Sequence, residues 1–362
     1  MPRIGIMTFL HNNNYGSALQ AWALQTALRD MGMDAEHIDY CPDSREKLTN
    51  LLRCGNSPAL LLDGLRKRVV RMTQTGAREK AAAFSAFYRE QMRVSGVCRR
   101  HAELEALAAH YDLLLCGSDQ IWSPVWLNPA YFLDFAGDKP RVAYAASLGV
   151  EAMPCRSKTR RMAGLIAPFD AVSVREEEGA RLVERIAGRH ADVMPDPVCL
   201  IGRERWLRLA QERAYDGKYI ACYFIGDRPD YWQQVRRLQE ETRCGVVVIP
   251  VTDGAYRQPY TLAEGLSPQA WLGTLGGAER VVTDSFHGAL FACVLGRKLT
   301  LLRRYREDDP ESKNSRIDQL MRTLRISPND TEMDMEAVSA RLADERERGL
   351  AWLHHTINQA TR

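Results

Sequence analysis

The 362-residue sequence has no apolar run that approaches the roughly 20 residues needed to span a membrane as a helix. Its first apolar segment, Ile4 to Phe9, begins almost at the initiator and is too short and too poorly flanked for a signal peptide. The net charge is only +3, which argues against nucleic acid as a partner. We therefore expect a soluble, cytoplasmic protein that does not bind nucleic acid.

The nine cysteines show no repeated pair spacing. Four of them, Cys116, Cys199, Cys222 and Cys293, fall in apolar runs that are typical of strands or helices. Such cysteines behave as small core residues in a reducing compartment. The sequence therefore predicts neither disulfides nor a metal site, and it contains no internal repeat and no low-complexity segment.

Strand-like and helix-like segments alternate along the chain in two successive blocks, which predicts an α/β protein with two doubly wound, Rossmann-like domains. The strands expected in the first block are 3–9, 35–40, 112–116, 141–145, 171–174 and 192–194. Those expected in the second block are 219–225, 245–251, 280–283 and 299–302.

The blocks suggest domain boundaries. We expect an N-terminal α/β domain over 1–198, with a basic helical insertion around 44–100, and a C-terminal α/β domain over 199–334. Apolar residues recur among many charges after Met335, so 335–362 should form a long amphipathic helix that packs back across the domains.

His287 is the most informative residue. Two valines lead into Thr283, Asp284 and Ser285, and a helix-like apolar run follows, so a buried parallel strand should turn here directly into a helix. The carboxyl edge of such a sheet is where α/β proteins bind ligands, and an imidazole can move a proton near neutral pH. The alternative is that His287 caps the helix or packs in the core.

Two loops precede other helices. The first strand ends in Asn12, Asn13, Asn14, Tyr15, Gly16 and Ser17. This loop can present amides to a ligand, although it carries neither G-x-G-x-x-G nor G-K-[ST] and resembles an ordinary tight turn equally well. The strand 112–116 ends in Gly117, Ser118, Asp119 and Gln120, which must surface at a carboxyl edge. In the aromatic cluster that follows, we expect Trp122 to contact a ligand, and Trp126 and Phe132 to form a small core.

Two arginines are candidate anion-binding residues. Arg175 ends a strand and is followed by three glutamates, so it can grip a carboxylate or phosphate, or form a salt bridge with one of those glutamates. Arg316 follows Asn314 and Ser315 at the start of a later helix, where capping explains the motif nearly as well.

In order along the chain, these motifs resemble the polysaccharide pyruvyl transferases. The segments that carry the resemblance are the Asn-Asn-Asn-Tyr-Gly-Ser loop, Gly-Ser-Asp-Gln-Ile-Trp, Tyr-Ala-Ala-Ser-Leu-Gly at 144–149, Ser-Val-Arg-Glu at 173–176, Asp-Pro-Val at 196–198, Thr-Asp-Ser-Phe-His-Gly at 283–288 and Asn-Ser-Arg at 314–316. The resemblance implies a GT-B-like fold with a cleft between two sheets. It also implies phosphoenolpyruvate as donor, a sugar hydroxyl pair as acceptor and a pyruvate ketal as product.

The resemblance places Arg175 on the family arginine that holds the donor and His287 on the family histidine near it. Ser285, Gly288 and Arg316 join Arg175 as predicted donor-binding residues, while the two loops and Trp122 are predicted to bind the acceptor. Family members often have an arginine where this chain has Ser285, and an acidic residue where it has Ser17. Asp119 and Asp284 are the substitutes for that carboxylate, so we assign His287, Asp119 and Asp284 to catalysis.

Ketal formation from an enol phosphate requires an acid, a base and cationic anchors, but no cofactor or metal. Two alternatives remain. A GT-B glycosyltransferase could hold the diphosphate of a nucleotide sugar in the same cleft. A non-catalytic member of the family would only bind glycans.

The segment 66–100 is strongly basic, with ten Lys or Arg against two Asp or Glu. Its apolar residues, among them Val69, Phe84, Phe87 and Met92, lie at partly helical spacing. One interpretation is a helical excursion with a solvated basic face. The other is a dock for the anionic inner face of the membrane, where a lipid-linked acceptor would lie.

Overall fold

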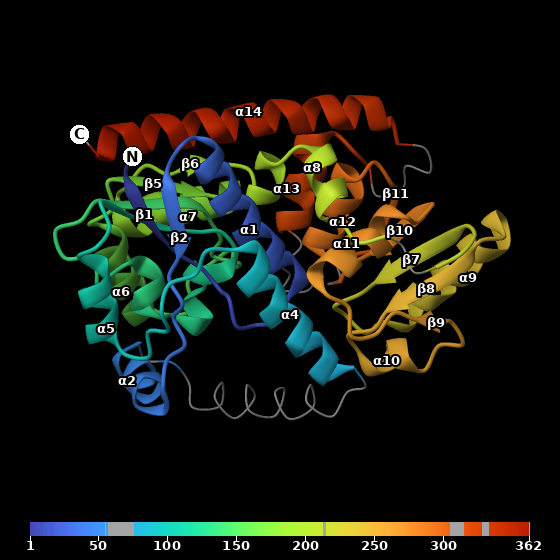
Figure 1. The fold of residues 1–362 in the computed structure, drawn as a ribbon, viewed down its shortest axis with the longest axis horizontal. Helices are drawn as coiled ribbons and strands as arrows, with labels where there is room; N and C mark the ends of the chain where they lie inside the picture. Colours follow the sequence, from blue (N-terminus) through green and yellow to red (C-terminus); the bar gives the residue numbers. More distant parts are fainter. Residues whose placement is uncertain (55, 57–75, 213–214, 305–314, 328–332, 362) are drawn as a thin grey trace. The chain divides into compact units, whose positions relative to one another are not determined.

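We analysed a computed structural model, which describes residues 1–54, 56, 76–212, 215–304, 315–327 and 333–361. The chain divides into two compact units (Figure 1). Unit 1 comprises residues 1–74, 85–200 and 345–362, and unit 2 comprises residues 75–84 and 201–344. The described residues 76–84 thus belong to unit 2, and the last part of the chain returns to unit 1.

Unit 1 is built on a six-stranded parallel sheet in the order β2-β1-β3-β4-β5-β6. The strands are β1 Arg3–Met7, β2 Asp34–His37, β3 Leu113–Cys116, β4 Arg141–Ala146, β5 Ala171–Val174 and β6 Asp192–Val193. All four residues of β3 are buried, as expected for a central parallel strand that helices cover on both faces. The continuous apolar runs of the sequence therefore predicted this sheet correctly.

The helices of unit 1 connect consecutive strands. They are α1 Tyr15–Asp30, α2 Ser44–Cys54, α5 His101–Ala108, α6 Arg156–Ile166 and α7 Glu177–Ala187, together with α4 Ala77–Gln91, whose first residues belong to unit 2. Short 3-10 turns are η1 Gln120–Trp122, η2 Pro124–Trp126, η3 Pro129–Phe132 and η4 Pro197–Leu200. Helix α7 begins with acidic residues that complement its dipole and ends at Gly188, whose φ of 60° suits a glycine C-cap.

Unit 2 is built on a five-stranded parallel sheet in the order β11-β10-β7-β8-β9. Its strands are β7 Tyr219–Tyr223, β8 Gly245–Ile249, β9 Thr261–Leu262, β10 Arg280–Thr283 and β11 Lys298–Leu301. Four of these strands were expected. The sequence did not predict β9, because two residues are too few to show a strand period.

The helices of unit 2 are α8 Arg203–Leu209, α9 Pro229–Thr242, α10 Asp253–Tyr256, α11 Pro268–Gly276, α12 Phe286–Val294 and α13 Ser315–Leu324. Helix α12 is almost wholly buried against β10 and β11. Phe291 of α12 packs edge-on against Trp206 and Trp271, with ring centroids 4.9 and 5.4 Å apart. This aromatic cluster fixes α12 within its unit.

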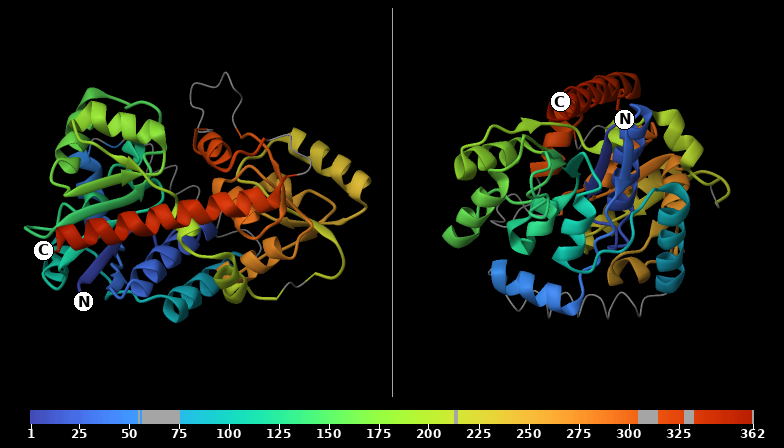
Figure 2. Two further views of the ribbon diagram at one scale, coloured as in Figure 1. Left: turned by 90° about the horizontal axis from the view of Figure 1, so that it is seen from above. Right: turned by 60° about the vertical axis from the view of Figure 1, so that its left-hand side comes forward.

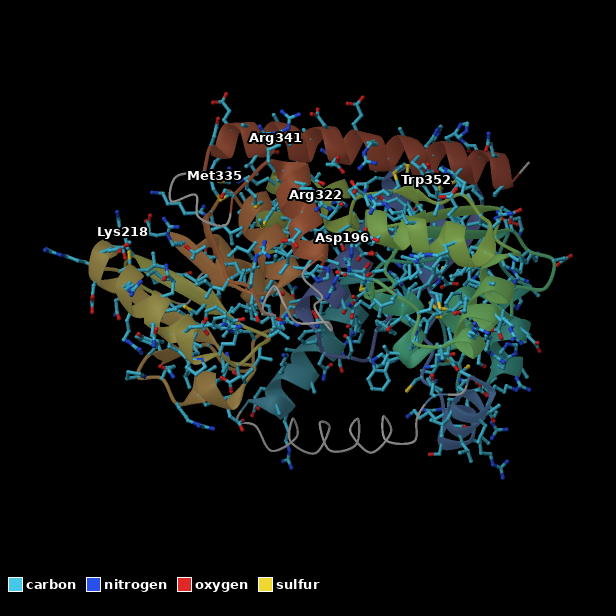
Figure 3. All side chains as sticks on the ribbon, turned by 180° about the vertical axis from the view of Figure 1, so that it is seen from behind. Asp196, Lys218, Arg322, Met335, Arg341 and Trp352 are labelled. Carbon is cyan, nitrogen blue, oxygen red and sulfur yellow. The ribbon has the colours of Figure 1, made fainter. Side chains whose placement is uncertain are left out.

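Helix α14, Met335–Ala360, is the long C-terminal helix that the sequence predicts, and it is continuous (Figure 2). Its residues from Glu345 onward belong to unit 1. There Trp352, labelled in Figure 3, donates its indole N–H to Asp192 at 2.8 Å. Gly349 permits a close approach, because a Cβ at this position would lie 2.6 Å from both Leu200 and the Tyr144 hydroxyl.

Part of the basic segment 66–100 lies outside the described residues, including Val69. In its described part, Phe84, Phe87 and Met92 are buried. Arg93 pairs with Asp34 at 2.8 Å and Arg100 pairs with Asp43 at 3.1 Å. These contacts agree with a packed helical excursion over 77–92.

Candidate functional site

The first candidate site lies at the carboxyl edge of the unit 1 sheet. Strand β1 leads to β2 on one side of the sheet, and the chain then crosses to β3 on the other side of β1. Such a reversal is the switch point at which open α/β sheets bind ligands. The loops after β1 and β3 meet there, and these are the two loops that the sequence singled out.

Ser17 joins the two loops. Its hydroxyl donates a hydrogen bond to Asp119 Oδ2 and accepts one from Asn12 Nδ2 at 2.9 Å. Asp119 Oδ1 in turn accepts from the backbone N–H of Gln120 at 2.8 Å. Asn14 caps α1 by accepting from the N–H of Ser17 at 3.3 Å. The predicted site residues of these loops therefore form one connected polar network.

The other predicted loop residues have structural roles. Asn13 lies in the left-handed region with a φ of 48°, which asparagine tolerates, and the buried Tyr15 and Gly16 begin α1. A Cβ at Gly117 would lie 1.9 Å from the carbonyl oxygen of Tyr144, so only glycine fits beside β4. Ser118 is buried and donates to the carbonyl of Ala145 at 2.6 Å.

Gln20 is a buried residue of this edge that the sequence did not predict. Its side chain donates to Thr8 Oγ1 at 3.1 Å and to the carbonyl of Ser17 at 3.0 Å, and it accepts from the N–H of Ser118 at 3.1 Å. Gln20 therefore ties α1 to the ends of both β1 and β3. Gln20 lies within a mostly apolar helix, and the sequence gives no sign of its hydrogen bonds to residues far along the chain.

In the aromatic cluster, Phe132 is buried as predicted, whereas the predicted burial of Trp126 is wrong. Trp122 is fully buried, stacks on Phe132 with centroids 5.0 Å apart, and donates its indole N–H to the carbonyl of Tyr131. Trp126 is instead 51% exposed. The 3-10 turn η1 directs Trp122 into the core, where Phe132 and Phe169 enclose it. Trp122 is therefore part of the core of unit 1.

Arg175 lies at the carboxyl end of β5 in a buried ion network. Its Nη1 is 2.5 Å from Asp196 Oδ2 and its Nε is 3.5 Å from Glu176 Oε1, and all three side chains are buried. Burial alone would lower the pKa of the guanidinium, but the charges of Asp196, Glu176 and Asp119 together raise it above its usual value. Glu176 also accepts from Ser147 Oγ at 2.6 Å. This geometry agrees with the salt-bridge alternative, with Asp196 as an additional partner.

A second feature of this edge escaped the sequence analysis. His11, in the loop after β1, lies with its Nε2 2.5 Å from Oδ1 of Asp39, which follows β2. The His11 side chain is about half exposed, at 48%, whereas that of Asp39 is 14% exposed. A carboxylate that orients an accessible imidazole is an arrangement suited to proton transfer.

The second candidate site lies at the carboxyl edge of the unit 2 sheet, where β7 leads to β8 on one side and β10 lies on the other. This is the switch point of unit 2. His287 occupies the first turn of α12, directly after β10, and its ring packs edge-on against Phe286 with centroids 5.2 Å apart. It is largely but not completely buried. The strand-turn-helix predicted around His287 is therefore confirmed.

Two neighbours of His287 shape this turn. Ser285 is the N-cap of α12 and accepts from the N–H of Gly288 at 3.3 Å. A Cβ at Gly288 would lie 2.5 Å from Thr283 Oγ1 and 3.2 Å from the ring of Tyr223. Glycine at 288 therefore lets α12 start close against β7 and β10.

Asp284 accepts hydrogen bonds from several parts of unit 2. Its buried carboxylate accepts from the N–H groups of Ile225 and Gly226 at 2.7 and 2.8 Å, and from the Tyr231 hydroxyl at 3.2 Å. Arg304 Nε adds a fourth bond at 3.1 Å. With both oxygens occupied, Asp284 ties β10 to the loop after β7.

The last predicted donor-binding residue is Arg316. Arg316 is half-buried in the first turn of α13, and Asn314 lies outside the described residues. Asp119 and Arg175 belong to unit 1, whereas His287 belongs to unit 2. Across the described part of the chain, no group of three or more His, Cys, Asp or Glu residues is arranged to hold a metal ion. None of its helices is long and apolar enough to cross a membrane.

A comparison with protein-family models identifies the chain. The model for polysaccharide pyruvyl transferases matches residues 14–303, which include both loops of the unit 1 site and the β10–α12 turn. The chain belongs to the polysaccharide pyruvyl transferase family. It is therefore a transferase of a family that acts in polysaccharide synthesis. No curated protein matches its sequence.

Solved structures show the fold. A putative UDP-N-acetylglucosamine 2-epimerase from Listeria monocytogenes is 12% identical, with a TM-score of 0.53 over 100% of this chain and 91% of that one. UDP-GlcNAc 2-epimerase from Neisseria meningitidis, bound to UDP-GlcNAc, is 10% identical, with a TM-score of 0.52 over 99% of this chain and 94% of that one. These neighbours have the GT-B fold, so this pyruvyl transferase family member is GT-B-like, as the sequence predicted.

Proposed function

We propose that this family member forms a pyruvate ketal, with phosphoenolpyruvate as donor and two hydroxyls of a sugar as acceptor. The observation that carries the proposal is the family match over residues 14–303, together with the place of His287 at the switch point of unit 2. No cofactor enters the reaction that we propose.

The reaction requires the addition of one proton to carbon, the loss of two hydroxyl protons and one leaving group. A proton adds to the methylene carbon of the donor, which becomes the methyl group, while a sugar hydroxyl oxygen bonds to the central carbon. The second hydroxyl oxygen then bonds to the same carbon, and the carbon–oxygen bond to phosphate breaks. Of the two hydroxyl protons released, one balances the proton that the methyl group gained and the other leaves with the base or the phosphate. An acid and a base are therefore sufficient.

We assign the acid to His287, because an imidazole can donate and accept protons near neutral pH. Ser285, whose oxygen caps α12, retains a hydroxyl hydrogen that it can donate to the donor. At the unit 1 edge, we assign the orientation of the acceptor hydroxyl to Asp119, with Ser17 and Asn12 holding its loop. Arg175 supports this edge through Asp196 and Glu176.

The test is release of inorganic phosphate from phosphoenolpyruvate in the presence of a panel of glycosides and nucleotide sugars. Phosphate release that depends on one acceptor, with a product heavier by a pyruvate ketal in mass spectrometry, is the expected result. Sugar transfer from a nucleotide sugar without use of phosphoenolpyruvate would establish the glycosyltransferase alternative instead. If no glycoside or nucleotide sugar is consumed and only glycans bind, the chain is a non-catalytic glycan-binding member.

We also propose peripheral contact with anionic membranes through the basic segment 66–100. Its charge excess supports this proposal, because each basic residue near an anionic bilayer contributes about 1 kcal/mol. Cosedimentation with anionic and neutral vesicles over a salt series tests it. Equal binding to both vesicle types, or none at low salt, would contradict it.

A further inference from the structure

Arg304 is a cation at the carboxyl edge of unit 2 that the sequence analysis did not consider. It follows β11, the neighbour of β10 in the sheet. Its Nε donates to Asp284 Oδ2 at 3.1 Å and its Nη2 donates to the carbonyl oxygen of Asp284 at 3.4 Å. The guanidinium thus lies against the backbone that immediately precedes Ser285 and the first turn of α12.

The Arg304 guanidinium is fixed by hydrogen bonds but remains partly exposed to solvent. The Asp284 side chain is fully buried, whereas that of Arg304 is 26% exposed. Asp284 already accepts bonds from the N–H groups of Ile225 and Gly226 and from the Tyr231 hydroxyl, so its negative charge is shared among four donors. Arg304 Nη1 has no hydrogen-bond partner among the described residues, which leaves it able to bind a further acceptor. A guanidinium that is held through Nε and Nη2 and open at Nη1 can bind a carboxylate or a phosphate.

Gly226 shows that the loop after β7 is shaped around this pair. A Cβ at this position would lie 2.8 Å from Asp284 Oδ2 and 3.1 Å from Cγ of Arg304. Any larger residue would displace either the carboxylate or the arginine. The Arg304–Asp284 pair is therefore packed closely against the loop after β7. It is not an ion pair between two exposed side chains.

The neighbouring arginines are not equivalent to Arg304. Arg303 points to α13, where its Nη2 lies 3.1 Å from Asp318, and Arg175 lies in unit 1 between two buried carboxylates. Position 285, adjacent to Asp284, carries only the short side chain of serine. A guanidinium at the turn between β10 and α12 therefore comes from Arg304, because Ser285 has no positive charge.

We propose that Arg304 binds the anionic donor at the carboxyl edge of unit 2, with Asp284 as the residue that orients it. This proposal rests on the proposed function for the identity of the donor, but the anion-binding role is independent of it. The chemical class recognised is a phosphate or carboxylate group on a small molecule.

The experiment is calorimetric titration of the full chain with phosphoenolpyruvate, inorganic phosphate and UDP. Arg304→Ala should weaken phosphoenolpyruvate binding about tenfold or more, the scale expected for loss of a hydrogen bond between charged groups. Arg304→Lys should recover part of the affinity. The matched control is Arg303→Ala, which removes the adjacent arginine and should change the affinity less than about twofold. Adding Ser285→Arg to Arg304→Ala should restore binding, because position 285 adjoins the carbonyl that Arg304 now contacts.

The outcomes separate this inference from the proposed function. If Arg304→Ala and the wild type bind phosphoenolpyruvate with equal affinity, the proposed role of Arg304 is overturned. Phosphoenolpyruvate would then still stand as the proposed donor. Binding of phosphate or UDP that depends on Arg304, without binding of phosphoenolpyruvate, would refute the donor and support the anion site. Failure of the wild type to bind any of the three anions would overturn the inference. If Arg304→Ala does not fold, Arg304→Gln keeps a donor to Asp284 but has no positive charge, and the same comparison applies to it.

Discussion

The Ser17 hydroxyl donates a hydrogen bond to a carboxylate oxygen of Asp119, which joins the loop after β1 to the loop after β3 at the switch point of unit 1. The two residues are separated by 102 positions in the sequence. Ser17, which follows Gly16, is therefore not a carboxylate itself. Instead, it is hydrogen-bonded to the candidate catalytic carboxylate of Asp119.

This pair leads to a prediction about coupling. Ser17→Ala should lower the free energy of unfolding by about 1.5–3 kcal/mol, because a hydrogen bond to a charged group is lost. Ser17→Ala and Asp119→Ala combined should cost less than the sum of the single changes, since both remove the same bond. Urea unfolding of the four proteins measures this coupling. Strict additivity would mean that the two side chains do not interact in solution.

Sequence patterns predicted the strands well because central parallel strands are continuous apolar runs. The strand ends and the two switch-point loops followed from where polar residues interrupt those runs. Pairing partners were not predictable in the same way. Asp196 is 21 residues from Arg175, and Arg304 is 20 residues from Asp284, so neither contact leaves a local periodic trace.

The aromatic residues show another limit of sequence reasoning. Trp122 and Trp126 lie in successive 3-10 turns, which have no long apolar face from which burial could be predicted. Only the packing of Phe132 and Phe169 around Trp122 decides which indole is buried. Polar and aromatic residues after a strand therefore predict where a site lies. They do not show which of the aromatic side chains is exposed there.

Arg175 should act mainly through stability. Arg175→Ala would leave Asp196 and Glu176 buried without their counter-charge, so we expect a loss of about 3–5 kcal/mol in the free energy of unfolding. Arg175→Lys should recover only part, because an ammonium group cannot bridge both carboxylates as a guanidinium does. Thermal and urea unfolding measure this effect.

The control is Arg181→Ala, which removes an exposed arginine paired with Glu177 and Glu178 and should cost less than about 1 kcal/mol. A folded Arg175→Ala protein with wild-type stability and strongly reduced affinity for phosphoenolpyruvate would show that the sequence-based donor role is right.

His37 should make unit 1 less stable in acid. The residue is fully buried in β2, and burial lowers its pKa to about 4, although hydrogen bonds to the backbone of Ala21 and Ile6 act in the opposite direction. Between its unfolded pKa near 6.5 and this value the unfolded chain binds more protons, so stability falls as the pH falls through that range. At about 1.4 kcal/mol per pKa unit, the loss between pH 7 and pH 4.5 should be roughly 2.5 kcal/mol.

His37→Gln tests this effect, because its amide can donate to the carbonyl of Ala21 as His37 Nε2 does but does not titrate. The variant should lose less stability than the wild type between pH 7 and pH 4.5, measured by urea unfolding at both values. The exposed His190 provides the control, since His190→Gln should leave the pH dependence unchanged. Identical pH dependence of wild type and His37→Gln would contradict the assignment.

The last prediction concerns proton transfer by His287. If its imidazole protonates the donor, His287→Gln should lower turnover by roughly 100-fold or more, which is the usual scale for a general acid. The melting temperature should change little, because α12 is held in its unit by the aromatic core around Phe291. Phosphate release from phosphoenolpyruvate with a competent acceptor gives the rate, and calorimetry gives the donor affinity, which should stay within a few-fold of the wild type. The exposed His110 supplies the matched control, since His110→Gln should retain full turnover. A His287→Gln protein that melts much lower yet keeps its rate per folded molecule would instead place His287 among the packing residues of α12.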